Sequence, residues 1–262
     1  MKTVIITGST RGLGYGLADS FLSRGCGVVI SGRTEDGVAK AVDELVGKHA
    51  TESVHGVTCD VTSYERVRNL WNAGFQHFGR VDCWINNAGI STVRKKLWEH
   101  PPSEIRNVVG VNLVGTIYGC KVAFEQMTSQ GFGAIYNVEG MGSNGQRVSG
   151  LSLYGTSKYG LRYFNEALAE ESKDSPVIVG ALSPGMLVTD LLTSERDADF
   201  KNWEKTKRVL NILADRVETV APWLVDKILE NKSSGVNIRW LTRGKILWRF
   251  MSAPLIKRDV IG

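Results

Sequence analysis

Short apolar runs alternate along the chain with segments in which apolar positions recur every three or four residues. The runs include "TVIIT" from residue 3, "GVVISG", "VDCWINNAG", "GAIYNV" and "VIVGALS". Strands buried on both faces have nearly continuous apolar runs, whereas the three-to-four spacing is typical of amphipathic helices. Strands that alternate with helices predict βαβ units. We therefore predict an α/β fold, a doubly wound parallel sheet of about seven strands with helices on both faces.

The alternation is interrupted near residue 190. Residues 190–235 are charged and helical in pattern, and a last strand is predicted at "VNIRWL". This arrangement predicts a helical lid before the last strand. No internal repeat, low-complexity tract or Pro/Gly-rich linker divides the sequence, so we expect one domain over residues 1–262.

Positive charge is concentrated near the C-terminus. The net charge is +5, and residues 201–262 hold 13 Lys/Arg against 6 Asp/Glu and four of the seven tryptophans. Such a segment suits an acidic lipid surface or a flat acidic ligand, and equally a solvated helix face over buried tryptophans. No nucleic-acid-binding motif accompanies the charge, so no nucleic-acid partner is expected. The string "IRWLTRGKILWRFM" predicts peripheral membrane contact through 239–258, with subunit packing as the alternative.

Other features bear on location and metal binding. The apolar runs are too short to cross a bilayer, and the first strand begins almost at residue 1, so a cytoplasmic location is expected. The four cysteines and four histidines show no paired or metal-ligand spacing. This pattern predicts reduced thiols and no metal site.

A glycine-rich turn follows the first strand. Gly8, Gly12 and Gly14 have the spacing G-x-x-x-G-x-G between a strand and a helix. Glycines at such positions let a pyrophosphate approach the backbone, and the N-terminus of the following helix attracts phosphate. The pattern predicts a Rossmann-type dinucleotide site. The loop residues assigned to it are Gly8, Ser9, Thr10, Arg11, Gly12, Leu13 and Gly14.

The end of the second strand indicates which nicotinamide cofactor is bound. NAD sites usually place an acidic residue there to hold the ribose hydroxyls, whereas "ISGRT" places Arg33 in reach of that position. Arg11 lies in the glycine-rich loop, and two guanidinium groups bind a 2′-phosphate by charge and by bidentate geometry. NADPH is therefore the predicted cofactor, and Glu35 keeps NAD as the alternative.

Tyr154 and Lys158 stand four residues apart, so both side chains lie on one face of a helix. A tyrosine has a reference pKa of about 10, and a neighbouring ammonium favours the phenolate and lowers that value. The phenol can give a proton to a carbonyl oxygen while a reduced nicotinamide delivers hydride to the carbon. The pair therefore predicts reduction of a small-molecule carbonyl substrate.

Together these motifs resemble the short-chain dehydrogenase/reductase family. "TGSTRGLG", "NNAG" at 86–89, Asn112 in "GVNLVGT", "YGTSK" and "SPGMLVTD" occur in the family's order up to about Asp190. The resemblance implies that Asp60 binds the adenine amino group, that Asn112 holds a water linking Lys158 to solvent, and that subunits form homodimers or homotetramers. The further cofactor-binding residues that it implies are Val61, Asn87, Ala88, Gly89, Pro184, Gly185, Leu187 and Thr189.

One family feature is missing. The family usually has a serine about thirteen residues before the tyrosine, where this chain has Met141, or Gly140 when strands are aligned, and neither has a side-chain donor. Ser143 in "NVEGMGSNGQ" is the predicted replacement, with Asn144 or a backbone N–H as alternatives. Glu139 is expected at the strand end, and an acidic role for it stays open. A site without any donor would indicate a non-catalytic cofactor-binding protein. The predicted catalytic residues are Ser143, Tyr154, Lys158 and Asn112.

The altered stretch narrows the resemblance. An acidic residue and glycine followed by "MGS", then "YGTSK", "SPGMLVTDLL" and "IRWLTRGKI" resemble the chlorophyll(ide) b reductase branch of the family. That branch uses NADPH to reduce the 7-formyl group of a chlorin to hydroxymethyl, so the implied substrate is a chlorophyllide. Reductases of acyl, sugar or steroid carbonyls are the alternative. Trp203, Trp223, Trp240 and Trp248 offer stacking area for a flat ring, or are core or subunit-interface residues.

Overall fold

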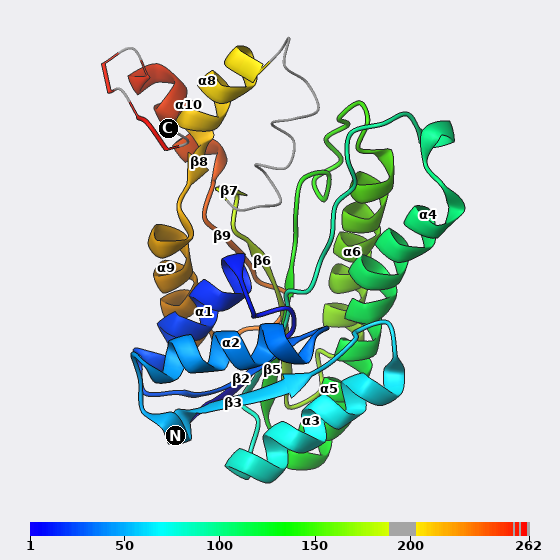
Figure 1. Cartoon of the computed structure of the whole chain (residues 1–262), viewed down its shortest axis with the longest axis vertical. Coiled ribbons are helices and arrows are strands. Elements are labelled where there is room, and N and C mark those ends of the chain that lie inside the picture. The colour runs from blue at the N-terminus through cyan, green and yellow to red at the C-terminus, as the bar shows by residue number, and fades with distance from the viewer. Residues whose placement is uncertain (189–202, 254, 257, 261–262) are drawn as a thin grey trace.

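Seven parallel strands form the central sheet of the computed structural model, which describes residues 1–188, 203–253, 255–256 and 258–260 (Figure 1). Their order is β3–β2–β1–β4–β5–β6–β9. Because the order reverses between β1 and β4, the sheet has the Rossmann topology with its switch point there. The predicted fold class is confirmed. The strands are β1 (Thr3–Ile6), β2 (Gly27–Gly32), β3 (Val54–Thr58), β4 (Cys83–Asn86), β5 (Gly133–Val138), β6 (Val177–Ser183) and β9 (Asn237–Arg239).

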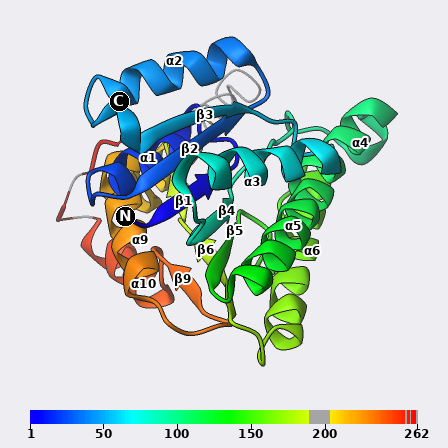
Figure 2. The same ribbon diagram turned by 90° about the horizontal axis from the view of Figure 1, so that it is seen from below.

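Helices cover both faces of the sheet (Figure 2). One face packs against α1 (Gly12–Leu22), α2 (Glu35–Val46) and α9 (Val217–Glu230). The other packs against α3 (Tyr64–Phe78), α5 (Gly115–Gln130) and α6 (Ser152–Glu171), and α4 (Pro102–Val109) lies against α6. Short helical segments lie at Thr51–Ser53, Leu97–Glu99 and Gly110–Val114. The layered arrangement brings the ends of all seven strands to two opposite edges.

The two hydrophobic cores follow from the alternation of side chains along each strand. In β1, Val4 and Ile6 enter the core beneath α1 and α9, whereas Ile5 enters the core beneath α3 and α5. All three side chains are buried, and each fully buried aliphatic side chain contributes about 1.5–3 kcal/mol. This two-sided burial explains why the strands have continuous apolar runs in the sequence.

Four further elements lie in the C-terminal part of the described chain. The short strand β7 (Met186–Leu187) pairs with β8 (Ala214–Asp215), which follows α8 (Trp203–Leu213), and α10 (Arg243–Ser252) follows β9. The expected lid range 190–235 includes α9, which packs against α1 as part of the core. A lid can therefore involve only the earlier part of that range, of which residues 190–202 lie outside the described residues.

One helical stretch, Pro102–Gln130, is long and apolar enough to cross a bilayer by length and composition. It joins α4, a π-helical turn and α5, and half of its most apolar window is buried. Val108, Ala123 and Met127 of this stretch are fully buried in the described fold. The stretch therefore contributes to the core between the sheet and its helices.

Candidate active site

The glycine-rich loop after β1 is held by the loop after β4. The Thr7 hydroxyl accepts hydrogen bonds from the backbone N–H groups of Asn87 and Ala88 at 2.9 and 3.0 Å. The Asn87 amide donates to the carbonyl oxygens of Thr7 and Gly8, both at 2.9 Å. Gly8 has φ +62°, and an added Cβ would lie 2.8 Å from the Ala88 Cα. Gly8, Asn87 and Ala88 thus meet at the switch point, and Thr7 is a supporting residue that the sequence analysis missed.

The N-terminus of α1 is suited to a phosphate group. Its N-cap residue, Arg11, provides no side-chain cap, and the first turn contains no acidic residue. By contrast, Thr34 and Ser63 cap α2 and α3 by accepting hydrogen bonds from first-turn N–H groups. Because an uncapped helix N-terminus presents N–H donors and partial positive charge, the residues present fit a pyrophosphate at this position.

Thr10 lies against the end of β2. An added Cβ on Gly32 would lie 2.6 Å from the Thr10 Cγ2, so only glycine lets the loop pack this closely. The buried Ser9 hydroxyl accepts a hydrogen bond from the Ser31 backbone N–H at 2.9 Å, which ties the loop to β2. Arg33 follows this contact with an exposed side chain. The glycine-rich loop and the predicted 2′-phosphate residue are therefore adjacent.

Asp60 lies near the start of the loop that follows β3. Burial raises the pKa of its carboxyl, but two hydrogen bonds from Thr62, followed by the charges of Arg33 and Arg66, outweigh burial and hold the pKa below its usual value. Arg66, on α3, is a cation that the sequence analysis did not single out. Val61 is buried beside this carboxylate. Arg33 and Arg66 thus act on the same predicted adenosine end.

Asn112 lies in the π-helical turn Gly110–Val114, a feature often found at functional sites. Its Oδ1 accepts from the Ile90 N–H at 2.8 Å, and its Nδ2 donates to the Ile90 carbonyl at 2.8 Å and to the Ser157 hydroxyl at 3.0 Å. An added Cβ on Gly89 would lie 3.5 Å from the Asn112 Oδ1 and 3.6 Å from the Lys158 Nζ. Asn112 therefore joins the loop after β4 to α6, and its water relay stays a prediction.

Tyr154 and Lys158 are buried in the first turns of α6. The Lys158 Nζ donates to the Val138 carbonyl at 3.1 Å and lies 5.9 Å from the centroid of the Tyr154 ring. Burial lowers the pKa of Lys158 to about 8, an effect that the nearby Glu139 opposes. Burial also raises the pKa of Tyr154 to about 12. The pKa of Tyr154 is therefore raised and not lowered as expected, and desolvation is the cause.

The Tyr154 hydroxyl occupies the space beside Gly140. An added Cβ on Gly140 would lie 2.3 Å from the Tyr154 Oη and 3.2 Å from the Lys158 Cε. Gly140 follows Glu139, whose backbone N–H continues the pairing with β6 by donating to the Leu182 carbonyl at 2.8 Å. A serine at position 140 could not be accommodated without moving the tyrosine. The space beside residue 140 is therefore filled by the Tyr154 hydroxyl.

Glu139 is the buried acid of this site. Its Oε2 accepts hydrogen bonds from the Ser183 hydroxyl at 2.6 Å, the Asn237 amide at 3.0 Å and the Ser143 hydroxyl at 3.4 Å. The Ser143 hydroxyl is therefore directed toward Glu139, whereas Asn144 is exposed. Ser183 and Asn237 were not predicted, and their one signal in the sequence was a place at the ends of predicted strands.

The segment after β6 lies at the same edge of the sheet. Pro184 follows β6 directly and is buried, Gly185 is exposed, and Leu187 is buried within β7. These three predicted cofactor-binding residues therefore lie at the carboxyl end of β6, close in sequence to Ser183. Thr189 lies outside the described residues.

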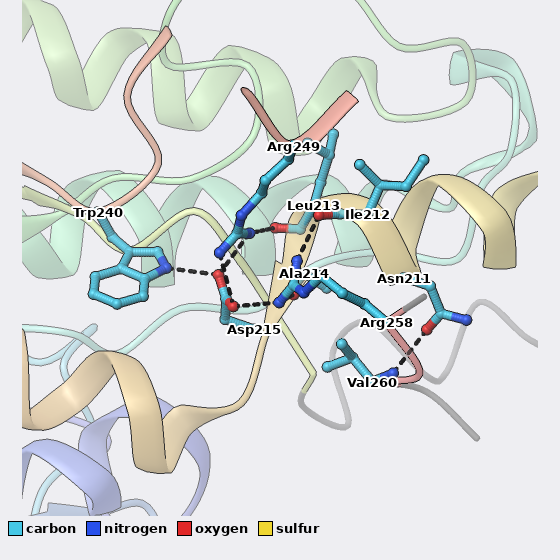
Figure 3. A network of polar contacts seen from close by, with 9 residues as sticks. All are labelled: Asn211, Ile212, Leu213, Ala214, Asp215, Trp240, Arg249, Arg258 and Val260. Carbon is cyan, nitrogen blue, oxygen red and sulfur yellow. Dashed lines mark hydrogen bonds and ion pairs between the residues drawn. The ribbon is translucent and has the colours of Figure 1, made fainter. Parts of the chain in front are cut away.

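Asp215 holds the C-terminal segment together (Figure 3). It accepts hydrogen bonds from Arg249 at 3.0 Å, from Arg258 at 2.6 Å and from the Trp240 indole N–H at 2.6 Å. Burial raises the pKa of Asp215, but the hydrogen bonds from Arg249 and Trp240 and the charges of both arginines outweigh it and lower the pKa. This anion therefore ties β8 to α10 and to the chain that follows.

The four C-terminal tryptophans have different surroundings. Trp223 and Trp240 meet edge to face with centroids 5.2 Å apart, and both pack against the core. These two are structural, which agrees with the core alternative in the sequence analysis. Trp248 is exposed on α10, and the Trp203 side chain lies outside the described part of the chain.

The cysteines are free and buried. Burial raises the thiol pKa of Cys59 and of Cys120 to about 12, so neither is reactive at neutral pH. Within the described ranges, no group of three or more His, Cys, Asp or Glu side chains is placed to hold a metal ion.

Comparison with known proteins shows the family to which the chain belongs. The family model of short chain dehydrogenases matches residues 2–199, and the chain belongs to this family. It is therefore an oxidoreductase built around a nicotinamide-cofactor fold, as the motifs indicated.

Two relatives within this family are named as chlorophyll(ide) b reductases. The chain is 36% identical to the probable chloroplastic chlorophyll(ide) b reductase NYC1 of Arabidopsis thaliana, over 97% of this chain and 53% of that protein. It is 35% identical to the chloroplastic chlorophyll(ide) b reductase NOL of the same plant, over 95% of this chain and 72% of that protein. The resemblance to this branch is confirmed, although the chain spans about half the length of NYC1.

Two solved structures share the fold. ElxO with NADP bound has a TM-score of 0.80 and 26% identity, covering 91% of this chain and 96% of that one. A 3-ketoacyl-(acyl-carrier-protein) reductase from Brucella melitensis, complexed with NADH, has a TM-score of 0.77 and 25% identity over the same shares. One neighbour holds NADP and the other NADH, so the fold itself accepts either cofactor.

Proposed function

We propose that the protein is an NADPH-dependent carbonyl reductase that reduces the 7-formyl group of a chlorin to hydroxymethyl. The observation that carries the reaction type is the buried Tyr154–Lys158 pair beside Gly140, at the carboxyl edge of the sheet. The near full-length similarity to proteins named chlorophyll(ide) b reductases supports the substrate class. A site that can protonate a carbonyl oxygen would thus act on the aldehyde group of a chlorin.

The proposed chemistry needs a proton donor and a positive charge that stabilises the donor after it has lost its proton. The bound cofactor supplies hydride to the carbonyl carbon. Tyr154, whose raised pKa keeps the phenol protonated at neutral pH, gives its proton to the carbonyl oxygen. The Lys158 ammonium then stabilises the phenolate that remains. Ser143 is the proposed second donor to the oxygen, exchanging its long 3.4 Å contact with Glu139 for the substrate.

Glu139 is proposed as a positioning residue for Lys158. Its carboxylate opposes the effect of burial on the lysine and so keeps more of the ammonium form. Lys158 and Arg162 of α6 are the cations that its charge acts on. Ser183 of β6 and Asn237 of β9 face it as neutral donors. Glu139 thus links three strand ends to the catalytic helix.

The preference for NADPH over NADH rests on the cations at the adenosine end. Arg33 and Arg66 both influence the Asp60 carboxylate, and Arg11 lies at the start of α1. A 2′-phosphate would add negative charge among these guanidinium groups, which form strong charge-assisted hydrogen bonds. The relative rates with NADPH and NADH test this preference.

A second candidate is reduction of an acyl ketone, favoured by the structural likeness to the 3-ketoacyl reductase. Purified protein, NADPH and chlorophyllide b separate the two. The proposal expects loss of the formyl chromophore in the absorption spectrum and no turnover in Tyr154→Phe. Turnover of simple ketones with an unchanged chlorophyllide b spectrum would favour the second candidate.

The proposal extends to the location and assembly of the protein. We expect a cytoplasmic homodimer or homotetramer, whereas the plant relatives are named as chloroplastic. Size-exclusion chromatography with light scattering measures the assembly, and a monomer would contradict it.

A further inference from the structure

The helix α10 exposes large apolar side chains and buries an arginine. Arg249 is only 7% exposed and donates a hydrogen bond to Asp215. Leu247, Trp248 and Met251, by contrast, are 63%, 59% and 70% exposed. Helices on a protein surface normally bury the apolar face and expose the charged one. An exposed apolar face with a buried arginine therefore indicates a surface that meets an apolar partner.

The apolar surface continues beyond the helix. Phe250 is 45% exposed, and Leu255 and Ile256 after the helix are 88% and 48% exposed. Asp215 fixes the orientation, because its ion pairs with Arg249 and Arg258 hold the helix and the following chain from the inner side (Figure 3). We call the exposed side chains the α10 apolar surface. Its members are Leu247, Trp248, Phe250, Met251, Leu255 and Ile256.

Positive charge predominates around this surface. Residues 231–258 contain seven Lys/Arg and no Asp/Glu, and one exposed acid, Asp259, follows them. Arg239 and Arg243 are exposed at the end of β9 and the start of α10, and Arg208 is exposed on α8, which packs against α10. Apolar and aromatic side chains surrounded by cations are the composition of segments that lie in the interface of an anionic bilayer.

We infer that the α10 apolar surface docks the protein onto an anionic lipid bilayer, with Trp248 and Met251 in the interface and Arg239 and Arg243 at the headgroups. A second copy of the chain fits less well. A two-fold contact through this surface would bring together two rims in which positive charge predominates, which costs free energy. The inference rests on the surface alone and is independent of the proposed reaction.

Flotation of the full-length chain with vesicles tests the inference. One set of vesicles contains phosphatidylcholine and phosphatidylglycerol, and the other contains phosphatidylcholine alone. The variants are Trp248→Ala with Met251→Ala, Leu255→Ser alone, and Arg243→Gln. The matched control is Trp98→Ala, which removes a tryptophan that is 80% exposed at a distant site in the sequence. NADPH binding and the melting temperature check that each variant is folded.

The wild type and Trp98→Ala should float with the anionic vesicles, and added salt should reduce the bound fraction because it screens the cations. Trp248→Ala/Met251→Ala should bind at least tenfold more weakly, and Leu255→Ser should also weaken binding. Arg243→Gln should bind about fivefold more weakly. Absence of flotation by the folded wild type would overturn the inference. So would variants that bind like the wild type, or that change the oligomeric state and leave lipid binding intact.

Discussion

Replacing Gly140 with serine, the residue that the family usually has, should damage this enzyme. The added Cβ would lie 2.3 Å from the Tyr154 Oη, whereas ordinary contacts begin at about 3.4 Å, so the hydroxyl must move by about 1 Å. The backbone at Gly140 has a negative φ that any residue adopts, so the substitution acts through this contact and without backbone strain. A displacement of about 1 Å at a reacting group can cost roughly 10²-fold in rate.

The assay is kcat/KM for carbonyl reduction beside the dissociation constant of NADPH. Gly140→Ser and Gly140→Ala should each lose roughly 10²-fold in kcat/KM while NADPH binding stays near that of the wild type. Gly155→Ala is the matched control, because an added Cβ there meets nothing within 4 Å although it adjoins Tyr154 on the same helix. That variant should keep its activity. A Gly140→Ser enzyme as active as the wild type would refute this reasoning.

Three further predictions concern charge. The rate of reduction should fall as pH rises through about 8, where Lys158 loses its proton. Glu139→Gln should move this fall to lower pH, because the Glu139 carboxylate favours the ammonium form of Lys158. An unmoved pH–rate profile in that variant would contradict the role of Glu139. Arg33→Ala should raise KM for NADPH about tenfold and leave KM for NADH nearly unchanged, and equal effects on both would argue against 2′-phosphate binding. Asp215→Ala should cost about 3–5 kcal/mol in urea unfolding, since Arg249 would stay buried without its anion, and a loss below about 1 kcal/mol would show that the ion pair is dispensable.

The fold could be predicted from sequence because its strands are buried on both faces. Ile5 and Ile6 point into different cores, so β1 has three consecutive apolar residues from Val4 to Ile6, and the other central strands have similar runs. The helical pattern of residues 190–235 predicted helices but not where they pack. α9 has the amphipathic period of any surface helix, and the sequence does not say that Val220 and Leu224 pack beside α1. Such pairing depends on contacts about 200 residues apart.

The candidate site could be predicted where its residues are local. Tyr154 and Lys158 are one helical turn apart, so their spacing suffices to place them on one face. Glu139, by contrast, accepts a hydrogen bond from Asn237, which lies 98 positions later in the sequence. That contact exists because β5, β6 and β9 pair in register, which no local pattern states.

The C-terminal segment shows a different limit. Its basic and aromatic composition predicted an interfacial segment, and the exposed Trp248 is compatible with that prediction. The direction in which α10 faces could not be predicted, because it depends on the ion pair between Asp215 and Arg249 across 34 residues. A buried arginine in a helix with exposed apolar side chains contradicts the usual rule, and its distant partners Asp215 and Leu213 explain it.

Transfer of deuterium tests the central claim most directly. NADPH labelled with deuterium at the hydride position is incubated with the protein and chlorophyllide b, and the product is examined by mass spectrometry. The account predicts a hydroxymethyl product that carries the deuterium, formed by the wild type and not by Tyr154→Phe. An unchanged chlorophyllide b, or a reduced product formed equally by Tyr154→Phe, would contradict it.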